Sequence, residues 1–217
     1  MPAPLQPAIL LDMDGTLVDS EPLWHERMRA FARERGFAWT TEDLHWTTGR
    51  PMLEWAAVMH ERGAGLAPAA IVERIAAEVA EAVRADVPWL PGSLALLERI
   101  AERGVPAALV TNAAAVNARG LLAAAPEGAL RFAVSSDDVE RSKPDPQPYA
   151  TAIARLGADA ARSIAFEDSG SGARSAVAAG ARLWFLTTQL PASPVPAERT
   201  LGTLADASPD EILDALG

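Results

Sequence analysis

Four short apolar runs that end at polar or acidic residues constrain the fold of this chain more than any other feature. The first run, residues 8–11, ends directly at Asp12, as a buried parallel strand does when it delivers side chains at its carboxyl end. Three further runs share this character, at residues 107–110, 163–166 and 182–186. Helical patterns lie between them, and this alternation predicts an α/β fold with a doubly wound parallel sheet.

One long stretch between the first and second runs interrupts the alternation. It has no convincing strand pattern, and its helical patterns are amphipathic: Ile71, Ile75 and Val79 repeat at four-residue spacing on one face. Prolines at both ends mark points where a helix cannot simply continue. The predicted domains are a core of residues 1–20 and 88–217 and an inserted helical domain of residues 21–87.

Composition narrows the classes of protein that this chain can be. With 217 residues and 49% hydrophobic content, it can build a globular interior. A net charge of -10 argues against nucleic acid or an anionic membrane as a partner. The sequence has no cysteine, which excludes disulfides, thiolate metal sites and cysteine nucleophiles. The amino-terminal residues resemble neither a signal peptide nor a membrane span, so we expect a cytoplasmic protein.

Two acids follow the first apolar run. Asp12 and Asp14 point the same way if the backbone is extended, and Gly15 lets the chain turn away directly after them. Such crowded carboxylates persist when a cation neutralises them, and ligand sets made only of oxygen favour Mg²⁺. Taken alone, the motif is also compatible with an ordinary turn.

Polar residues follow two later runs, and a solitary lysine lies between them. Thr111 and Asn112 end the second run, where a hydroxyl and backbone N–H groups could hold phosphate oxygens, although such a pair also caps helices. Lys143 is the only lysine of the chain and stands in a proline-fixed turn, whereas every other fixed cation is arginine. Glu167 and Asp168 form a second acid pair after the third run.

In this order, the four polar segments resemble the four motifs of the haloacid dehalogenase superfamily, and the insert resembles the helical cap of its beta-phosphoglucomutase-like branch. Residues 19–24, the Thr48-Gly49-Arg50 segment and residues 210–213 are most similar to sugar-phosphate phosphatases, including those acting on 2-deoxyglucose 6-phosphate. The resemblance covers nearly the whole chain. It departs from the usual pattern at Thr111, Ser175 and Ala181, and none of these departures removes a reacting group.

The resemblance implies a role for each motif residue. Asp12 would be the nucleophile that carries the phosphoryl group, and Asp14 would be the general acid and base. Mg²⁺ would be held by the side chains of Asp12 and Asp168 and by the backbone carbonyl of Asp14, with Glu167 at its edge. Lys143 and Thr111 would hold phosphoryl oxygens.

Two further residues are candidate binding contacts: Asn112 for phosphate and Arg50 for substrate. The resemblance also implies a small phosphorylated metabolite, with a sugar phosphate as the first candidate, and a monomer.

Individual residues argue for or against several alternative functions. Dehalogenases of the superfamily usually lack the second acid of the first motif, which is present here as Asp14. Phosphonatases use a cap lysine, whereas Lys143 lies outside the insert. A non-catalytic phospho-acceptor module of the receiver type would lack both the helical insert and the acid pair after the lysine. A phosphosugar mutase stays open, although Trp24 takes the place of the mutase histidine and His25 falls one residue later.

Overall fold

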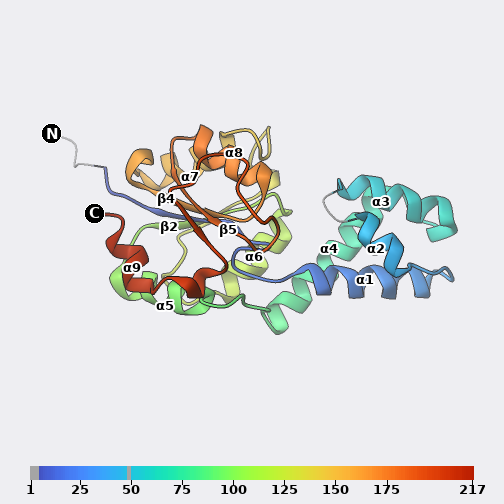
Figure 1. Cartoon of the computed structure of the whole chain (residues 1–217). Helices are drawn as coiled ribbons and strands as arrows, with labels where there is room; N and C mark the ends of the chain where they lie inside the picture. Colours follow the sequence, from blue (N-terminus) through green and yellow to red (C-terminus); the bar gives the residue numbers. More distant parts are fainter. Residues whose placement is uncertain (1–4, 48–49) are drawn as a thin grey trace. The chain divides into compact units, whose positions relative to one another are not determined.

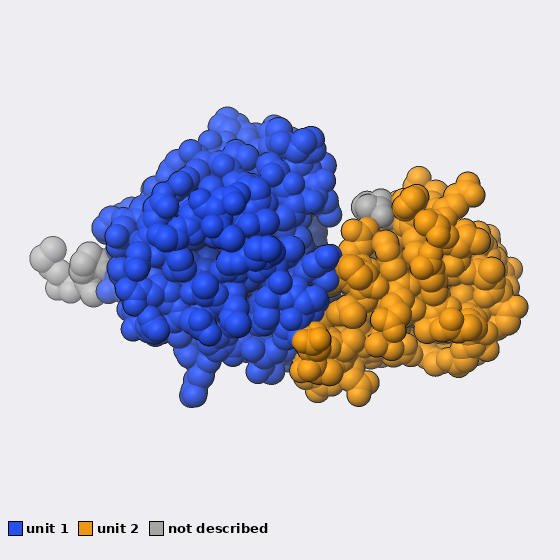
Figure 2. Space-filling model, turned by 60° about the horizontal axis from the view of Figure 1, so that its bottom comes forward, with its two compact units in different colours: residues 1–19, 87–217 blue, residues 20–86 orange. Residues whose placement is uncertain are grey.

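The computed structural model describes residues 5–47 and 50–217, and it divides into two compact units (Figure 2). Unit 1 comprises residues 1–19 and 87–217, and unit 2 comprises residues 20–86. These bounds differ by one residue from the core and insert expected from the sequence. A role of unit 2 as a cap stays a prediction.

Unit 1 contains a six-stranded parallel sheet with strand order β3-β2-β1-β4-β5-β6. The strands are β1 (Ile9–Leu11), β2 (Ala107–Val110), β3 (Ala133–Val134), β4 (Ile164–Glu167), β5 (Arg182–Leu186) and β6 (Arg199–Leu201). The α/β class and the parallel sheet predicted from the sequence are confirmed. Four strands coincide with the four apolar runs to within one residue at each end. The sequence did not reveal β3 and β6, which are too short and too mixed in polarity for a strand period to show.

Helices cover both sides of this sheet (Figure 1). Figure 1 shows α7 and α8 on one side and α5 and α9 on the other. The helices of unit 1 are α5 (Ser93–Arg103), α6 (Ala115–Ala124), α7 (Gln147–Leu156), α8 (Gly170–Ala178) and α9 (Pro209–Asp214). Because both faces are covered, the central strands carry apolar side chains throughout instead of alternating with polar ones.

The strand β1 lies at the centre of the sheet and positions the first acid motif. Its residue Leu11 is in register with Leu109 of β2 and with Phe166 of β4. All three residues of β1 are fully buried. The residues that directly follow β1, β2 and β4 therefore meet at one edge of the sheet, as expected for parallel neighbours.

Unit 2 is helical within its described residues. Its elements are α1 (Glu21–Glu34), α2 (Thr41–Thr47), α3 (Met52–Met59), a π-helical turn (His60–Ala64) and α4 (Pro68–Ala85). The helix α4 packs on α1 and α3 and buries Ile71, Ile75 and Val79, the face expected from their spacing. Trp39 and Trp55 are buried in this unit, which agrees with a structural role for these two indoles.

None of the helices in residues 5–47 and 50–217 combines the length and the apolar character that a membrane crossing requires.

Gly92 precedes α5 and generates a prediction about the stability of unit 1. Its φ is +87°, and an added Cβ would lie 2.3 Å from the backbone nitrogen of Ala205. Gly104, after the same helix, has a φ of +62° and no atom within 4 Å of such a Cβ. Gly104→Ala should lower the free energy of unfolding by about 1 kcal/mol through backbone strain alone. Gly92→Ala should lower it by the same strain and by a further ~2 kcal/mol or more, because its Cβ would collide with the backbone of Ala205. Urea unfolding of both variants measures the difference, and equal losses would contradict the close contact.

Candidate active site

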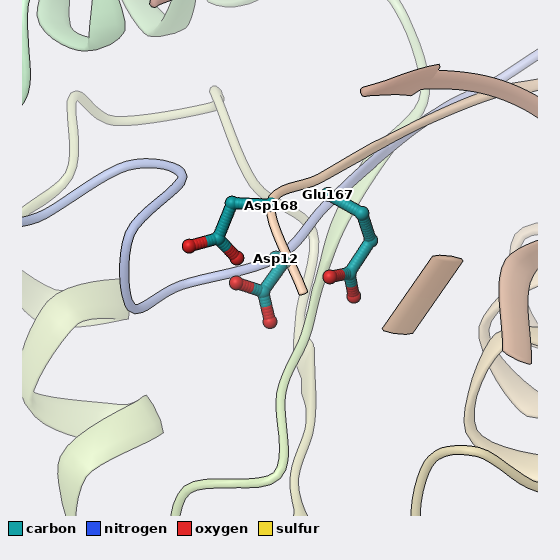
Figure 3. Close-up of side chains that lie close together, drawn as sticks. All are labelled: Asp12, Glu167 and Asp168. Atoms are coloured by element: carbon teal, nitrogen blue, oxygen red, sulfur yellow. The ribbon is translucent and has the colours of Figure 1, made fainter. Parts of the chain in front are cut away.

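The carboxyl ends of adjacent strands bring three carboxylates together (Figure 3). Asp12 follows β1, Glu167 ends β4, and Asp168 comes next. One carboxylate oxygen from each of the three lies within 4.8 Å of the others. All three residues are buried, and the most accessible, Asp12, is 7% exposed. The backbone N–H of Asp12 donates to the carbonyl oxygen of Phe166 at 3.1 Å, which couples the loop after β1 to β4.

The ammonium of Lys143 lies between two of these carboxylates. Its Nζ donates to Asp12 Oδ1 at 2.6 Å, to Glu167 Oε1 at 2.6 Å and to the carbonyl oxygen of Val110 at 2.7 Å. The three donors of the ammonium therefore each have an acceptor, which is required for a cation that is buried with its side chain only 2% exposed. The only lysine of the chain thus joins the first acid motif to the second.

The backbone of Lys143 is fixed by a side chain from another motif. Its N–H donates to Asn112 Oδ1 at 3.0 Å, and Asn112 Nδ2 donates to its carbonyl oxygen at 3.2 Å. Both polar ends of the Asn112 side chain thus contact this backbone, and its role toward phosphate stays a prediction. Ser175 on α8 donates to the carbonyl oxygen of Asp145 at 2.5 Å and anchors the same turn from the other side. Sequence reasoning noted Ser175 only as an unusual residue, because its partner lies 30 positions away.

Two glycines are required by the close approach of the carboxylates. A Cβ on Gly15 would lie 1.8 Å from Asp168 Oδ2, and Gly15 has a φ of +81°. A Cβ on Gly172 would lie 1.9 Å from Glu167 Oε1. Any larger residue at either position would displace a carboxylate of the cluster.

The other expected residues lie in different settings. Asp14 is half-buried in the turn after β1, where it forms an isolated parallel bridge with Val18. Thr111 is buried directly after β2, and its Oγ1 accepts a hydrogen bond from the backbone N–H of Ala113 at 2.9 Å. Its hydroxyl proton remains to be donated to a ligand.

Arg50 belongs to unit 2. It is exposed, it lies over the ring of Trp46 at 4.7 Å, and its Nη1 is 3.4 Å from Glu54 Oε2. Both contacts lie within unit 2, so the structure gives Arg50 local partners and leaves its role toward substrate a prediction. Thr48 and Gly49, quoted with it in the sequence resemblance, lie outside the described residues.

The buried negative charge shifts the protonation of the cluster. Burial raises the pKa of the Asp12 carboxyl well above its usual range; the charge of Glu167 raises it further, and Lys143 opposes both. Burial, followed by the charge of Glu167, raises the pKa of Asp168 to about 7. Burial lowers the pKa of Lys143, but Asp12 and Glu167 outweigh it, so that this pKa is raised overall.

This donor set fits a hard divalent cation. The cluster holds three buried carboxylates and one ammonium, which pairs with Asp12 and Glu167. Burial, followed by the charge of Glu167, raises the pKa of both aspartates. Oxygen donors at this spacing are the ligands that Mg²⁺ takes in proteins, and a cation would relieve the repulsion. The side chains of Asp12, Glu167 and Asp168 therefore have an arrangement that suits Mg²⁺.

A family model provides an independent comparison. The model of the haloacid dehalogenase-like hydrolases matches residues 7–180, a span that contains all four motifs. The chain belongs to the haloacid dehalogenase-like hydrolases. The resemblance noted in the sequence is thereby confirmed, and the protein is an enzyme of a hydrolase family.

Individual relatives of this hydrolase agree with the family match. Validoxylamine A 7'-phosphate phosphatase from Streptomyces hygroscopicus subsp. limoneus is 33% identical over 185 residues, which cover 82% of this chain and 84% of the relative. Phosphorylated carbohydrates phosphatase from Thermotoga maritima is 31% identical over 216 residues, 96% of this chain and 97% of the relative. The structure of CbbY from Rhodobacter sphaeroides in complex with phosphate has a TM-score of 0.77 at 25% identity, and the match covers 93% of this chain and 96% of that one.

Sequence reasoning gave no role to Tyr149, which contacts the site of this hydrolase. The Tyr149 hydroxyl donates to Glu167 Oε1 at 2.7 Å, and the residue is fully buried on α7. It is the only tyrosine of the chain, a signal of the same kind as the solitary lysine.

The raised pKa of Asp168 predicts how the stability of the metal-free hydrolase depends on pH. Because the folded-state pKa, about 7, exceeds the unfolded value of about 3.9, proton binding favours the folded state at low pH, and this contribution is lost as the pH rises through about 7. With a chelator present, the melting temperature of the wild type relative to that of Asp168→Asn should fall between about pH 5 and 8. Addition of Mg²⁺ should raise the melting temperature of the wild type again at the higher pH. If the melting temperature of the wild type relative to that of Asp168→Asn stays constant or rises over this range, the raised pKa of Asp168 is contradicted.

Proposed function

We propose that this hydrolase is a Mg²⁺-dependent phosphatase of a small phosphorylated metabolite, with a sugar phosphate as the substrate class, and that it acts through an aspartyl-phosphate on Asp12. The observation that carries the proposal is the ammonium of Lys143, held 2.6 Å from Asp12 Oδ1 inside the buried carboxylate cluster. A nucleophilic carboxylate that must meet an anionic phosphate requires such positive charge beside it. Two relatives at 31% and 33% identity are named as phosphatases of phosphorylated carbohydrate and of validoxylamine A 7'-phosphate, which supports the substrate class.

In the first step of the proposed reaction, a carboxylate oxygen of Asp12 attacks the phosphorus atom and the ester bond to the leaving oxygen breaks. Asp14 donates a proton to that oxygen. In the second step Asp14 takes a proton from water, the water oxygen attacks the phosphorus, and the bond to Asp12 breaks to release inorganic phosphate. Two displacements replace one difficult one, and Asp12 and Asp14 are regenerated.

The remaining residues would hold the phosphoryl group during both steps. Lys143 would neutralise charge that develops on its oxygens, and the Thr111 hydroxyl would donate to one of them. The side chains of Asp12 and Asp168 and the carbonyl of Asp14 would hold Mg²⁺, with Glu167 at its edge. When bound, Mg²⁺ offsets the repulsion between the anionic nucleophile and the anionic substrate.

Water is proposed as the phosphoryl acceptor in preference to a sugar. A mutase has to protect its phosphoenzyme, and the branch uses a cap histidine for this. His25 is half-buried on α1, and its Nε2 lies 3.5 Å from Glu21 Oε1 on the same helix. Trp24, at the matching position, packs edge-on against Trp55, with the ring centroids 6.5 Å apart, and an indole cannot relay a proton to an acid. A cytoplasmic location and a monomeric state stay predictions.

The test is a screen of phosphorylated metabolites for Mg²⁺-dependent phosphate release by the wild type and by Asp12→Asn. The amide is nearly isosteric with the carboxylate but is a poor nucleophile, so we expect the variant to fold and its turnover to fall by more than about 10³-fold. The loss of acid–base assistance by itself usually costs about 10²–10⁴-fold. The screen includes beta-glucose 1-phosphate with a trace of the 1,6-bisphosphate. Isomerisation that outruns phosphate release tenfold would overturn the proposal in favour of a mutase, and activity retained by Asp12→Asn would exclude covalent catalysis.

A second prediction concerns the identity of the buried cation. Lys143→Arg should lower turnover by more than about tenfold, because a planar guanidinium cannot direct three donors to Asp12, Glu167 and Val110 from one nitrogen. Arg141→Lys is the matched control: Arg141 lies two residues earlier, and its side chain is 65% exposed. Steady-state kinetics of both variants on the same substrate should show a loss in the first and none in the second. Normal turnover in Lys143→Arg would rule out this role for the ammonium.

A further inference from the structure

The carboxylate of Glu167 accepts three hydrogen bonds in the core of unit 1. Its Oε1 accepts from Lys143 Nζ at 2.6 Å and from the Tyr149 hydroxyl at 2.7 Å, and its Oε2 accepts from Ser169 Oγ at 3.0 Å. Glu167 itself is fully buried. A carboxylate oxygen has two lone-pair directions, so Lys143 and Tyr149 together saturate Oε1.

Tyr149 approaches this group from a separate element. It lies on α7, the helix that starts just after the turn of Lys143, and its ring is 5.1 Å from Lys143 Nζ. The ring also belongs to the apolar cluster of unit 1 that includes Leu10, Ala108 and Ala165. Phenylalanine would fill that space equally well. The hydroxyl is therefore the part of Tyr149 that packing alone does not explain.

We propose that Tyr149 is a positioning residue: its hydroxyl holds Glu167 Oε1 and, through it, the ammonium of Lys143 against Asp12. Glu167 and Asp12 compete for one ammonium at equal distances of 2.6 Å. The hydroxyl donates to Oε1 and so weakens the attraction of Glu167 for Lys143. Without it, Oε1 carries an unfilled lone pair in a buried site, and the ammonium moves toward Glu167 and away from Asp12. As a role in catalysis, this inference rests on the proposed phosphatase function.

The first experiment separates positioning from packing by kinetics. Tyr149→Phe removes only the hydroxyl. We expect kcat to fall about fivefold or more, because a hydrogen bond to a charged group is lost. KM for the phosphate ester should stay within about twofold of the wild type, because no contact with the substrate is removed. The substrate is the best ester found in the metabolite screen, at saturating Mg²⁺.

Ser163→Ala is the matched control for this variant. The Ser163 hydroxyl is equally buried, donates to the carbonyl oxygen of Asp159 at 2.6 Å and accepts from the N–H of Ala8 at 3.0 Å, but it lies at the opposite end of β4. It should lower the melting temperature and leave kcat unchanged. A kcat for Tyr149→Phe within twofold of the wild type, or a kcat loss no larger than that of Ser163→Ala, would overturn the proposal.

The second experiment does not depend on turnover. Because the chain has one tyrosine, incorporation of 3-fluorotyrosine gives one ¹⁹F resonance that reports on this hydroxyl. Glu167→Gln and Lys143→Arg should both shift the resonance, whereas Asp43→Asn in unit 2 should leave it in place. An unmoved resonance in Glu167→Gln or in Lys143→Arg would overturn the inference.

Failure of the proposed phosphatase function and failure of the proposed role of Tyr149 give different results. A wild type that releases phosphate from no ester contradicts the proposed function, and the ¹⁹F shifts then decide the coupling between Tyr149, Glu167 and Lys143 on their own. A wild type that is active while Tyr149→Phe behaves as the wild type contradicts only this inference.

Discussion

The ammonium of Lys143 is the interaction on which the rest of the site depends. Its three hydrogen bonds reach the loop after β1, the last residue of β4 and the last residue of β2. A buried cation with one acceptor fewer would carry a large desolvation cost, and buried carboxylates without the cation would repel one another. The same ammonium that would stabilise a phosphoryl group therefore also joins the three central strands at their carboxyl ends.

The surroundings of the cluster are arranged to keep charges close together. Gly15 and Gly172 each leave space that a carboxylate fills, and Asn112 and Ser175 fix the turn that carries the lysine. Three buried carboxylates surround a single ammonium, and burial, followed by the charge of Glu167, raises the pKa of both Asp12 and Asp168. Such stored repulsion is typical of sites that are completed by a cation or a substrate, where stability is exchanged for reactivity.

The residues of the four motifs all lie in one of the two units. Unit 1 contains the acids, the lysine and the threonine of all four motifs, whereas Arg50 of unit 2 contacts Trp46 and Glu54 of the same unit. Fold and reaction class are therefore properties of unit 1. Substrate identity is the property that the geometry of unit 1 constrains least, because a phosphoryl group is common to all candidate substrates.

The sequence by itself determined the parallel sheet, the residues at the strand ends and the family, because apolar runs and acid pairs are local patterns that report burial and strand termini directly. Only the tertiary structure decided which donors meet which acceptors. Lys143 and Asp12 are 131 positions apart, so no local pattern could pair them, and only the resemblance placed them in one site. The Asn112 amide holds the Lys143 backbone, and the Tyr149 hydroxyl donates to Glu167, and no pattern along the chain announces either contact. Strand order and the close approach of helices to the sheet fix these contacts, and they depend on packing between segments distant in sequence.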